Sequence, residues 1–358
     1  MRTTQIADLY QSEGPFASVT LDVGRAAENA HREHELRVRH ARDELLEAGA
    51  DPAVVDAVAR RLEEQVNEPS PVARAVVANA GGVVFDEVMR TEVPQTRTAW
   101  GPLPDVTAWL AHEDGTTPFV LAVVDHEGGD VATYVSDVPD PVEETSAGGE
   151  TLHINKVPSG GWSQLRYLHV TENVWKQNAE AVAEEIVSAV RNGPDLVLLA
   201  GDPYSRSAVA ERLEGTPVEV VQLESGSRAE DGGDGALQQA IREALLEHTV
   251  ARRLELTHTL QERVGQDNAV AVDVDAVAEA FVRGQVETLL IDPDAAAEHT
   301  VTAQDHPGLS IGAVSPTEPV PAHQAFVAAA ALTGADVAVG RAATLGGRPV
   351  AALLRWDQ

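Results

Sequence analysis

The sequence predicts an α/β protein, of the α+β kind, built from three domains. Apolar strand patterns alternate with helical patterns along most of the chain, as in sheets covered by helices. The length of 358 residues and a hydrophobic content of 43% are enough for several packed cores. We place the domain boundaries near residues 115 and 245, which gives domains 1–115, 116–245 and 246–358.

The first domain opens with a strand pattern in which apolar and polar residues alternate. Gly49 ends a long charged helix, and Asp51 followed by Pro52 is a strong start signal for the next helix. Gly81 and Gly82 mark the turn of a hairpin. The predicted elements are a strand at 17–23, helices at 26–48 and 51–66, and hairpin strands at 73–80 and 83–88.

The second domain combines a hairpin with a βαβ pattern, which predicts a sheet with helices packed on it. Prolines, acids and a Gly-Gly pair predict a surface loop at 139–150, and a glycine- and acid-rich loop is expected at 224–235. The predicted elements are strands at 119–124, 131–135, 196–200 and 218–223, and helices at 170–192 and 207–213.

The third domain follows a long helix at 237–263, which we expect to be broken once. A polar loop is expected at 293–321. The other predicted elements are helices at 274–283 and 322–332 and strands at 286–291, 335–339 and 350–356.

Residues 158–166, which we call the Gly-Gly tip, are the most informative stretch of the sequence. Gly160 and Gly161 allow backbone conformations that other residues avoid, and a long helical pattern begins directly after them. The chain has only two lysines, Lys156 and Lys176, and they flank this tip.

The local residues support two interpretations of the Gly-Gly tip equally well. It is an ordinary loop with Trp162 in the core, or it is a probe that enters a polyanionic space. In the second case Lys156, Arg166 and Lys176 offset phosphate charge, and Trp162 stacks on a base.

The formal charge of −31 repels nucleic acid at long range, so any RNA contact must come from local basic groups. The chain has no cysteine, which excludes disulfides and thiolate metal sites. It shows no membrane span and no secretory signal, so we expect a cytoplasmic protein. The acidity also suits either a salt-adapted organism or a genome that favours arginine over lysine.

A run of basic residues on the first helix includes Arg37, Arg39 and Arg42, interleaved with acids. Such a run is typically a solvated helix face with i,i+4 pairs, and its functional interpretation is a nucleic-acid contact.

Familiar catalytic motifs are missing from the sequence: there is no phosphate-binding P-loop, G-x-S-x-G elbow or H-E-x-x-H helix. Asp125 and Asp130 could hold Mg²⁺, although acidic turn residues explain them as well. Gly201-Asp202-Pro203 before a helix is a weak phosphate-binding signal. We therefore expect no cofactor, no metal and no catalytic residue.

Several ordered motifs resemble the archaeo-eukaryotic class-1 release factors and Pelota. Gly160-Gly161-Trp162-Ser163-Gln164-Leu165-Arg166-Tyr167 resembles the family's G-G-Q-S-x-L-R-[FY] before a long helix. Residues 196–201 and 238–241 resemble the segments that follow. Residues 284–291, 334–337 and 350–356 resemble motifs of the family's third domain, so the resemblance covers about 117–358.

This resemblance implies a ribonuclease-H-like middle domain and a third domain like the ribosomal proteins that bind kink-turn RNA. It implies binding to the ribosomal A site and its rRNA, with tRNA and a translational GTPase such as elongation factor Tu as further candidate partners. Membrane and DNA are not implied. In domain order the chain is similar to the bacterial Balon-like hibernation factors of translation stress.

Two departures from the family shape the functional hypothesis. The catalytic glutamine is replaced by Trp162, whose indole has one N–H and no acceptor, so peptide release is expected to be lost. Gln164 lies two residues further on, which leaves a shifted register open. Residues 1–115 lack the N-I-K-S motif of stop-codon reading.

We therefore expect a ribosome-associated factor that occupies the A site of idle or stalled ribosomes without reading stop codons or releasing peptide. The expected contact residues are Lys156, Gly160, Gly161, Trp162, Ser163, Gln164, Arg166, Lys176, Arg37, Arg39 and Arg42. The alternatives are a quality-control enzyme that cleaves tRNA or hydrolyses peptidyl-tRNA, and a diverged stress protein that makes only protein–protein contacts.

Overall fold

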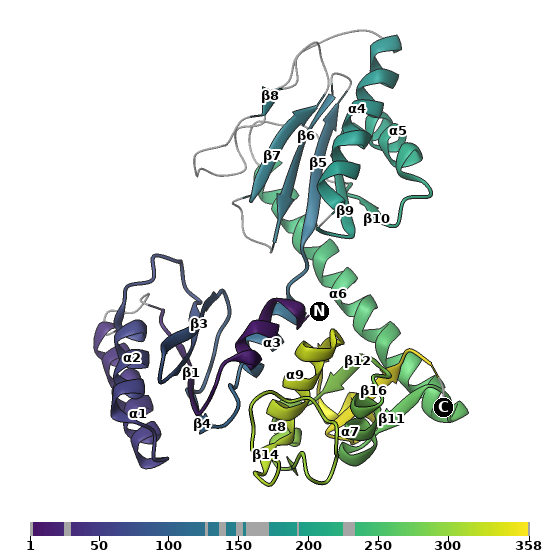
Figure 1. Cartoon of the computed structure of the whole chain (residues 1–358). Coiled ribbons are helices and arrows are strands. Elements are labelled where there is room, and N and C mark those ends of the chain that lie inside the picture. The colour runs from purple at the N-terminus through teal and green to yellow at the C-terminus, as the bar shows by residue number, and fades with distance from the viewer. Residues whose placement is uncertain are drawn as a thin grey trace. The chain divides into compact units, whose positions relative to one another are not determined.

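The computed structural model describes residues 3–24, 30–125, 128–135, 141–147, 153–154, 172–191, 193–224 and 233–356 (Figure 1). Its several sheets and helices confirm the predicted mixed α/β fold. The chain divides into two compact units, one formed by 1–114 with 256–358 and the other by 115–255. The division into three domains stays a prediction.

The first unit holds a four-stranded antiparallel sheet in the order β3-β2-β1-β4. Val19, Leu21 and Val76 of this sheet pack against α1 and α2, which lie side by side in Figure 1. Asp51 accepts the Ala53 N–H at 2.8 Å and so begins α2, as predicted. The elements are η1 (Thr3–Gln11), β1 (Phe16–Asp22), α1 (Ala30–Glu47), α2 (Pro52–Glu63), β2 (Ala73–Asn79), β3 (Gly82–Met89), β4 (Arg97–Gly101) and α3 (Thr107–Gly115).

The same unit contains a second sheet, in the order β11-β16-β12-β15. Helix α9 is almost wholly buried, because its run of alanines lets the helix approach its neighbours closely. The elements are β11 (Val270–Val272), α7 (Val274–Val282), β12 (Val286–Ile291), α8 (Pro293–Ala297), β13 (Thr300–Val301), β14 (Val320–Pro321), α9 (Ala322–Thr333), β15 (Asp336–Val339), η2 (Ala342–Leu345) and β16 (Val350–Leu354).

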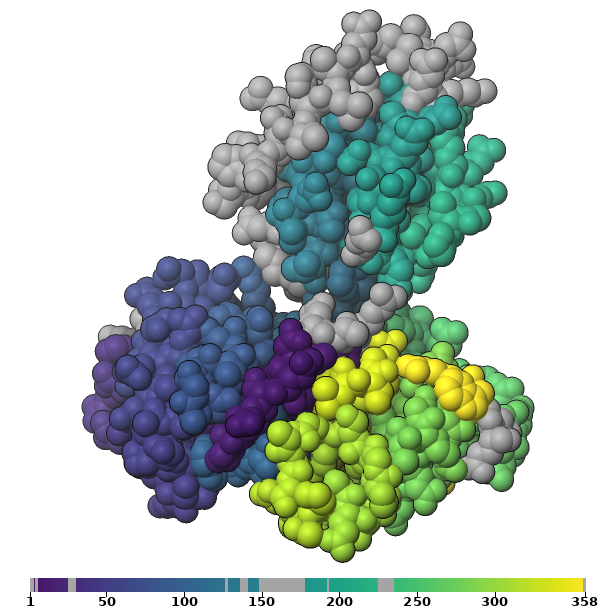
Figure 2. Space-filling model, in the orientation of Figure 1, coloured from purple at the N-terminus to yellow at the C-terminus, as the bar shows by residue number. Residues whose placement is uncertain are grey.

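One hydrophobic core joins the two sheets of the first unit. Phe16 and Trp109 from the N-terminal residues belong to the same buried cluster as Phe281 and Phe326. The Thr3 hydroxyl donates to the carbonyl of Ala335 at 2.8 Å. Figure 2 shows the purple N-terminal residues against the yellow-green residues that include α9. The N- and C-terminal segments therefore stabilise each other.

The second unit is built on a six-stranded sheet in the order β10-β9-β5-β6-β7-β8. Strands β5, β6 and β7 form an antiparallel meander, and β9 and β10 add in parallel on the other side of β5. This is the ribonuclease-H-like topology that the resemblance implies. The elements are β5 (Phe119–Asp125), β6 (Gly128–Tyr134), β7 (Glu143–Ala147), β8 (His153–Ile154), α4 (Glu172–Val190), β9 (Leu196–Gly201), α5 (Pro203–Leu213) and β10 (Glu219–Gln222).

Both faces of this sheet are covered. Val120 and Val197 pack against Ile186 of α4 on one face. On the other face, Leu121 and Leu198 belong to the core that holds Ile241, on the N-terminal part of α6 (Gly233–Gln266).

Three expectations from the sequence were wrong. The loop expected at 139–150 contains strand β7, because β6 offers an edge with which its backbone pairs. The helix expected to be broken is continuous over α6. The polar loop expected at 293–321 contains α8, which Asp292 caps, and the β13–β14 pair. In the described residues no helix has the length and apolar character needed to cross a bilayer.

Candidate functional site

The Gly-Gly tip lies outside the described residues. The predicted contact residues there are Lys156, Gly160, Gly161, Trp162, Ser163, Gln164 and Arg166. The structure does describe α4 from Glu172 onward, which confirms the long helix predicted after the tip. Lys176 lies in this helix, four residues from its first residue.

The three arginines predicted on α1 differ in how far they are neutralised. Arg37 donates to the Asp22 carboxylate at 2.9 Å and lies 3.7 Å from Glu33. Arg42 lies 2.7 Å from Asp56. Arg39 is exposed, and no ion pair is recorded for it within the described part of the chain. Arg39 therefore keeps the most available charge for an external anion.

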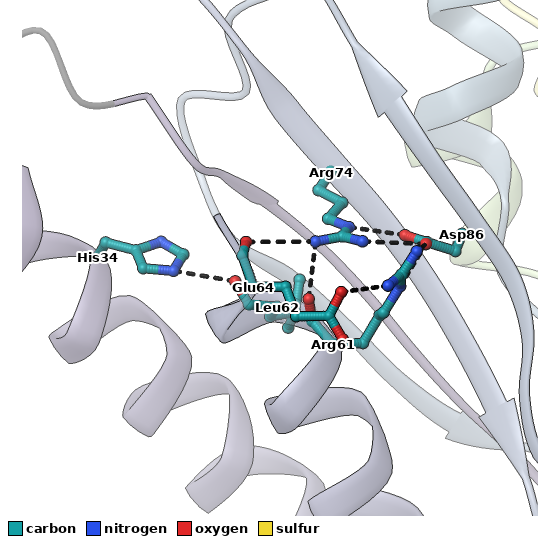
Figure 3. A network of polar contacts seen from close by, with 6 residues as sticks. All are labelled: His34, Arg61, Leu62, Glu64, Arg74 and Asp86. Atoms are coloured by element: carbon teal, nitrogen blue, oxygen red, sulfur yellow. Dashed lines mark hydrogen bonds and ion pairs between the residues drawn. The ribbon is translucent and has the colours of Figure 1, made fainter. Parts of the chain in front are cut away.

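A polar network joins α2 to the N-terminal sheet (Figure 3). The side chain of Arg74 is only 5% exposed and donates to Asp86 through Nε at 2.6 Å and Nη2 at 3.0 Å. Its Nη1 donates to the carbonyl of Arg61 at 2.7 Å. Arg61 also donates to Asp86 and pairs with Glu64. This network holds the helix on the sheet, which is a structural role.

The pKa of the Asp86 carboxyl reflects these contacts. Burial raises this pKa, but hydrogen bonds from Arg74 and Arg61 outweigh burial and hold the pKa below its ordinary value. Asp86 therefore stays ionised, and the buried guanidinium of Arg74 keeps its counter-charge.

A second buried pair joins the N- and C-terminal residues of the first unit. Nε2 of His323 lies 3.4 Å from Oδ2 of Asp105, and the Thr107 hydroxyl donates to Oδ1 at 2.6 Å. Burial raises the pKa of Asp105, while the hydrogen bonds from His323 and Thr107 lower it further than burial raises it. The result is an ionised carboxylate inside the core.

Asp125 and Asp130, the predicted candidates for Mg²⁺, lie on the neighbouring strands β5 and β6. Asp130 accepts a hydrogen bond from the Ser146 hydroxyl at 2.5 Å, and its pKa is raised, mainly by burial. The residues that the structure describes contain no group of three or more acidic, histidine or cysteine side chains arranged to hold a metal ion.

Gly201-Asp202-Pro203 begins α5, but its geometry argues against phosphate. Asp202 is the N-cap, and its carboxylate accepts the Ser205 N–H at 2.9 Å. An aspartate already accepts from the N-terminus of the helix, so an incoming anion would meet negative charge there.

Sequence reasoning did not find the Arg74–Asp86 and Asp105–His323 pairs. Asp105 and His323 lie 218 residues apart, so no local spacing connects them, whereas Arg74 and Asp86 lie on the two strands of the predicted hairpin, which could have indicated their proximity. Asp105 also carries a local signal of its own, because it precedes Thr107 in the pattern of an Asx turn at the start of α3.

Comparison with known proteins places the second unit in a defined class. Residues 118–266 match the model of the bacterial archaeo-eukaryotic release factor family 2. The matched range contains the Gly-Gly tip and the ribonuclease-H-like sheet. This part of the chain is therefore similar to the archaeo-eukaryotic release factors, as the sequence motifs predicted, and Pelota homologues are among its relatives.

Similar proteins extend this comparison. The uncharacterized protein Rv2629 of Mycobacterium tuberculosis is 27% identical over 302 residues, covering 81% of this chain and 78% of that protein. The Pelota homolog of Natronomonas pharaonis is 25% identical over 188 residues, covering 50% of this chain and 53% of its own length.

Two solved structures are similar to this chain at lower sequence identity. Pelota of Archaeoglobus fulgidus is 15% identical with a TM-score of 0.32, covering 79% of this chain and 80% of that one. Dom34 of S. cerevisiae, a translation termination-like factor that interacts with Hbs1, is 8% identical with a TM-score of 0.43, covering 80% of this chain and 81% of that one.

Proposed function

We propose that this protein is a ribosome-associated factor that occupies the A site of idle or stalled ribosomes without releasing peptide. The observation that carries the proposal is the release-factor match at 118–266, which includes the Gly-Gly tip. A ribosome-bound factor of this kind acts in the cytoplasm.

The tip sequence supports entry without hydrolysis. Gly160 and Gly161 let the backbone pass close to RNA, and Lys156 and Arg166 offset phosphate charge there. Trp162 stands where the family has its catalytic glutamine. An indole N–H can donate, but it has no acceptor with which to position a water molecule. In this proposal the tip still binds ribosomal RNA, but the protein no longer releases the nascent peptide.

The N-terminal residues support a role other than stop-codon reading, since they lack the family's N-I-K-S motif. Arg39 is an exposed cation on α1 with no recorded ion pair among the described residues, and of the three predicted arginines it is our candidate for an rRNA contact. A translational GTPase such as elongation factor Tu, and tRNA, are proposed as partners on the family resemblance alone.

Sedimentation with purified bacterial ribosomes tests the proposal. We expect the protein to co-sediment with ribosomes whose A site is empty and to be displaced when that site is filled with tRNA. Co-sedimentation that A-site tRNA leaves unchanged would refute occupancy of the A site. A protein that stays at the top of the gradient would refute ribosome association altogether.

Incubation with stalled ribosome–nascent-chain complexes separates this proposal from an enzymatic role. We expect nascent chain and tRNA to remain intact at stoichiometric occupancy. Release of the nascent chain, or a discrete tRNA fragment, would instead support a peptidyl-tRNA hydrolase or a tRNA nuclease.

A further inference from the structure

A groove of about 490 Å³ opens between α4 and α5 on the second unit. This is within the size range of protein pockets that take specific ligands, roughly 300–1,000 Å³. Its floor is apolar and buried, formed by Val124, Val182 and Val209, with Ala179 and Ala208 beside them.

The rim of the groove is acidic. Among the residues that the structure describes, Asp125, Glu180 and Glu211 line it together with one basic residue, Arg212. Arg212 already donates to the carbonyl of Ala208 at 2.6 Å. Glu180 and Glu211 are exposed, and no hydrogen bond or ion pair is recorded for either among the described residues. The rim therefore offers negative charge to an incoming group.

Tyr204, a residue that is 59% exposed, adds an aromatic side chain to the lining of the groove. An exposed ring beside carboxylates is a favourable place for a guanidinium, which stacks on aromatic faces while it hydrogen-bonds to carboxylates.

From these features we infer that the groove binds an arginine side chain from an extended, basic segment of a partner protein. The aliphatic stem of arginine fits the valine floor, and its planar head reaches the rim carboxylates beside Tyr204. This inference rests on the groove alone and stands independently of A-site binding.

RNA is a poorer occupant than a basic peptide. A phosphate in the groove would face Asp125, Glu180 and Glu211, and Asp202 already accepts from the N-terminus of α5. Charge complementarity therefore selects a cationic partner.

A fluorescein-labelled peptide, Gly-Ala-Arg-Ala-Arg-Ala-Gly, tests the inference by fluorescence anisotropy on the full chain. The peptide in which citrulline replaces both arginines keeps the shape and removes the charge. The measurements are made at about 150 mM salt, where electrostatic attraction between exposed charges more than roughly 8 Å apart is largely screened. We expect the arginine peptide to bind and the citrulline peptide to bind at least about fivefold more weakly.

Matched variants separate the groove from the general acidity of the chain. E180Q/E211Q removes two rim charges, whereas E243Q/E247Q removes two exposed charges on α6 of the same unit. We expect about fivefold weaker binding for the first pair and an unchanged affinity for the second. A208F, which fills the groove without changing charge, is expected to weaken binding as well.

Two results would overturn the inference. Equal losses in both glutamate pairs would show non-specific attraction to an acidic protein. Tighter binding of a single-stranded RNA oligonucleotide than of the arginine peptide would show that the groove does not select cations. Circular dichroism of E180Q/E211Q establishes that the fold is kept, since both positions are exposed.

Discussion

Replacing Asp86 by alanine leaves the guanidinium of Arg74 buried without its counter-charge. Arg74 is 5% exposed, so water cannot take the place of the two hydrogen bonds that it makes to Asp86. Removing one partner of a buried ion pair costs about 3–5 kcal/mol. Asp86 is 17% exposed and Arg74 keeps its bond to the carbonyl of Arg61, so we expect the lower end, about 3 kcal/mol.

The assay is thermal unfolding, with hydrogen exchange of β2 to follow the first unit separately. A loss of about 3 kcal/mol lowers the melting temperature of a domain of roughly 150–250 residues by about 6–12 °C. Glu64 is the matched control, because it pairs with the same Arg61 but is 55% exposed. E64A is expected to cost less than about 1 kcal/mol.

Equal destabilisation by D86A and E64A would refute this reasoning. A second variant tests the cause directly. The double variant R74M/D86L replaces both charges by apolar side chains and so leaves no buried guanidinium without a counter-charge. We therefore expect R74M/D86L to be more stable than D86A.

Three further variants test two buried carboxylates and one exposed arginine elsewhere in the structure. Because folding lowers the pKa of Asp105, its ionised carboxylate stabilises the folded first unit above the unfolded pKa, and this stabilisation is lost as pH falls through the folded pKa. D105N should therefore make the unfolding free energy of the first unit less sensitive to acid. Because burial raises the pKa of Asp130, ionising this carboxyl opposes folding at neutral pH. D130N should therefore stabilise the second unit at pH 7, and the gain in unfolding free energy should shrink as pH falls through the raised pKa; a destabilised D130N would contradict this. R39A should weaken ribosome binding and reduce the salt slope by about 1 without changing the melting temperature; an unchanged slope would exclude a phosphate contact by Arg39.

Periodicity predicted the buried elements of the fold well. The apolar runs that became β5 and β9 and the Asp51-Pro52 start of α2 carry local signals, and each was found where expected. Strand β7 carries no local signal, because its sequence Glu-Glu-Thr-Ser-Ala shows neither an alternation of apolar and polar residues nor an apolar run. Its conformation comes from pairing with β6, which is a tertiary effect.

The candidate site also has parts that local sequence predicts and parts that depend on folding. The Gly-Gly tip and its lysines stand out locally, so sequence could nominate them. The neutralisation of Arg37 by Asp22 and of Arg42 by Asp56 depends on side chains brought together by folding. The groove between α4 and α5 likewise combines residues from separate strands and helices, and no single motif marks it.

The central claim is that the Gly-Gly tip reaches ribosomal RNA, and site-specific photocrosslinking tests it most directly. A benzophenone amino acid placed at Trp162, with the same group at the exposed Val142 as control, is activated in cells under translational stress. We expect crosslinks from position 162 to large-subunit rRNA at the peptidyl-transferase centre, and none there from position 142. Crosslinks from position 162 only to proteins, or none to rRNA or tRNA, would contradict the account.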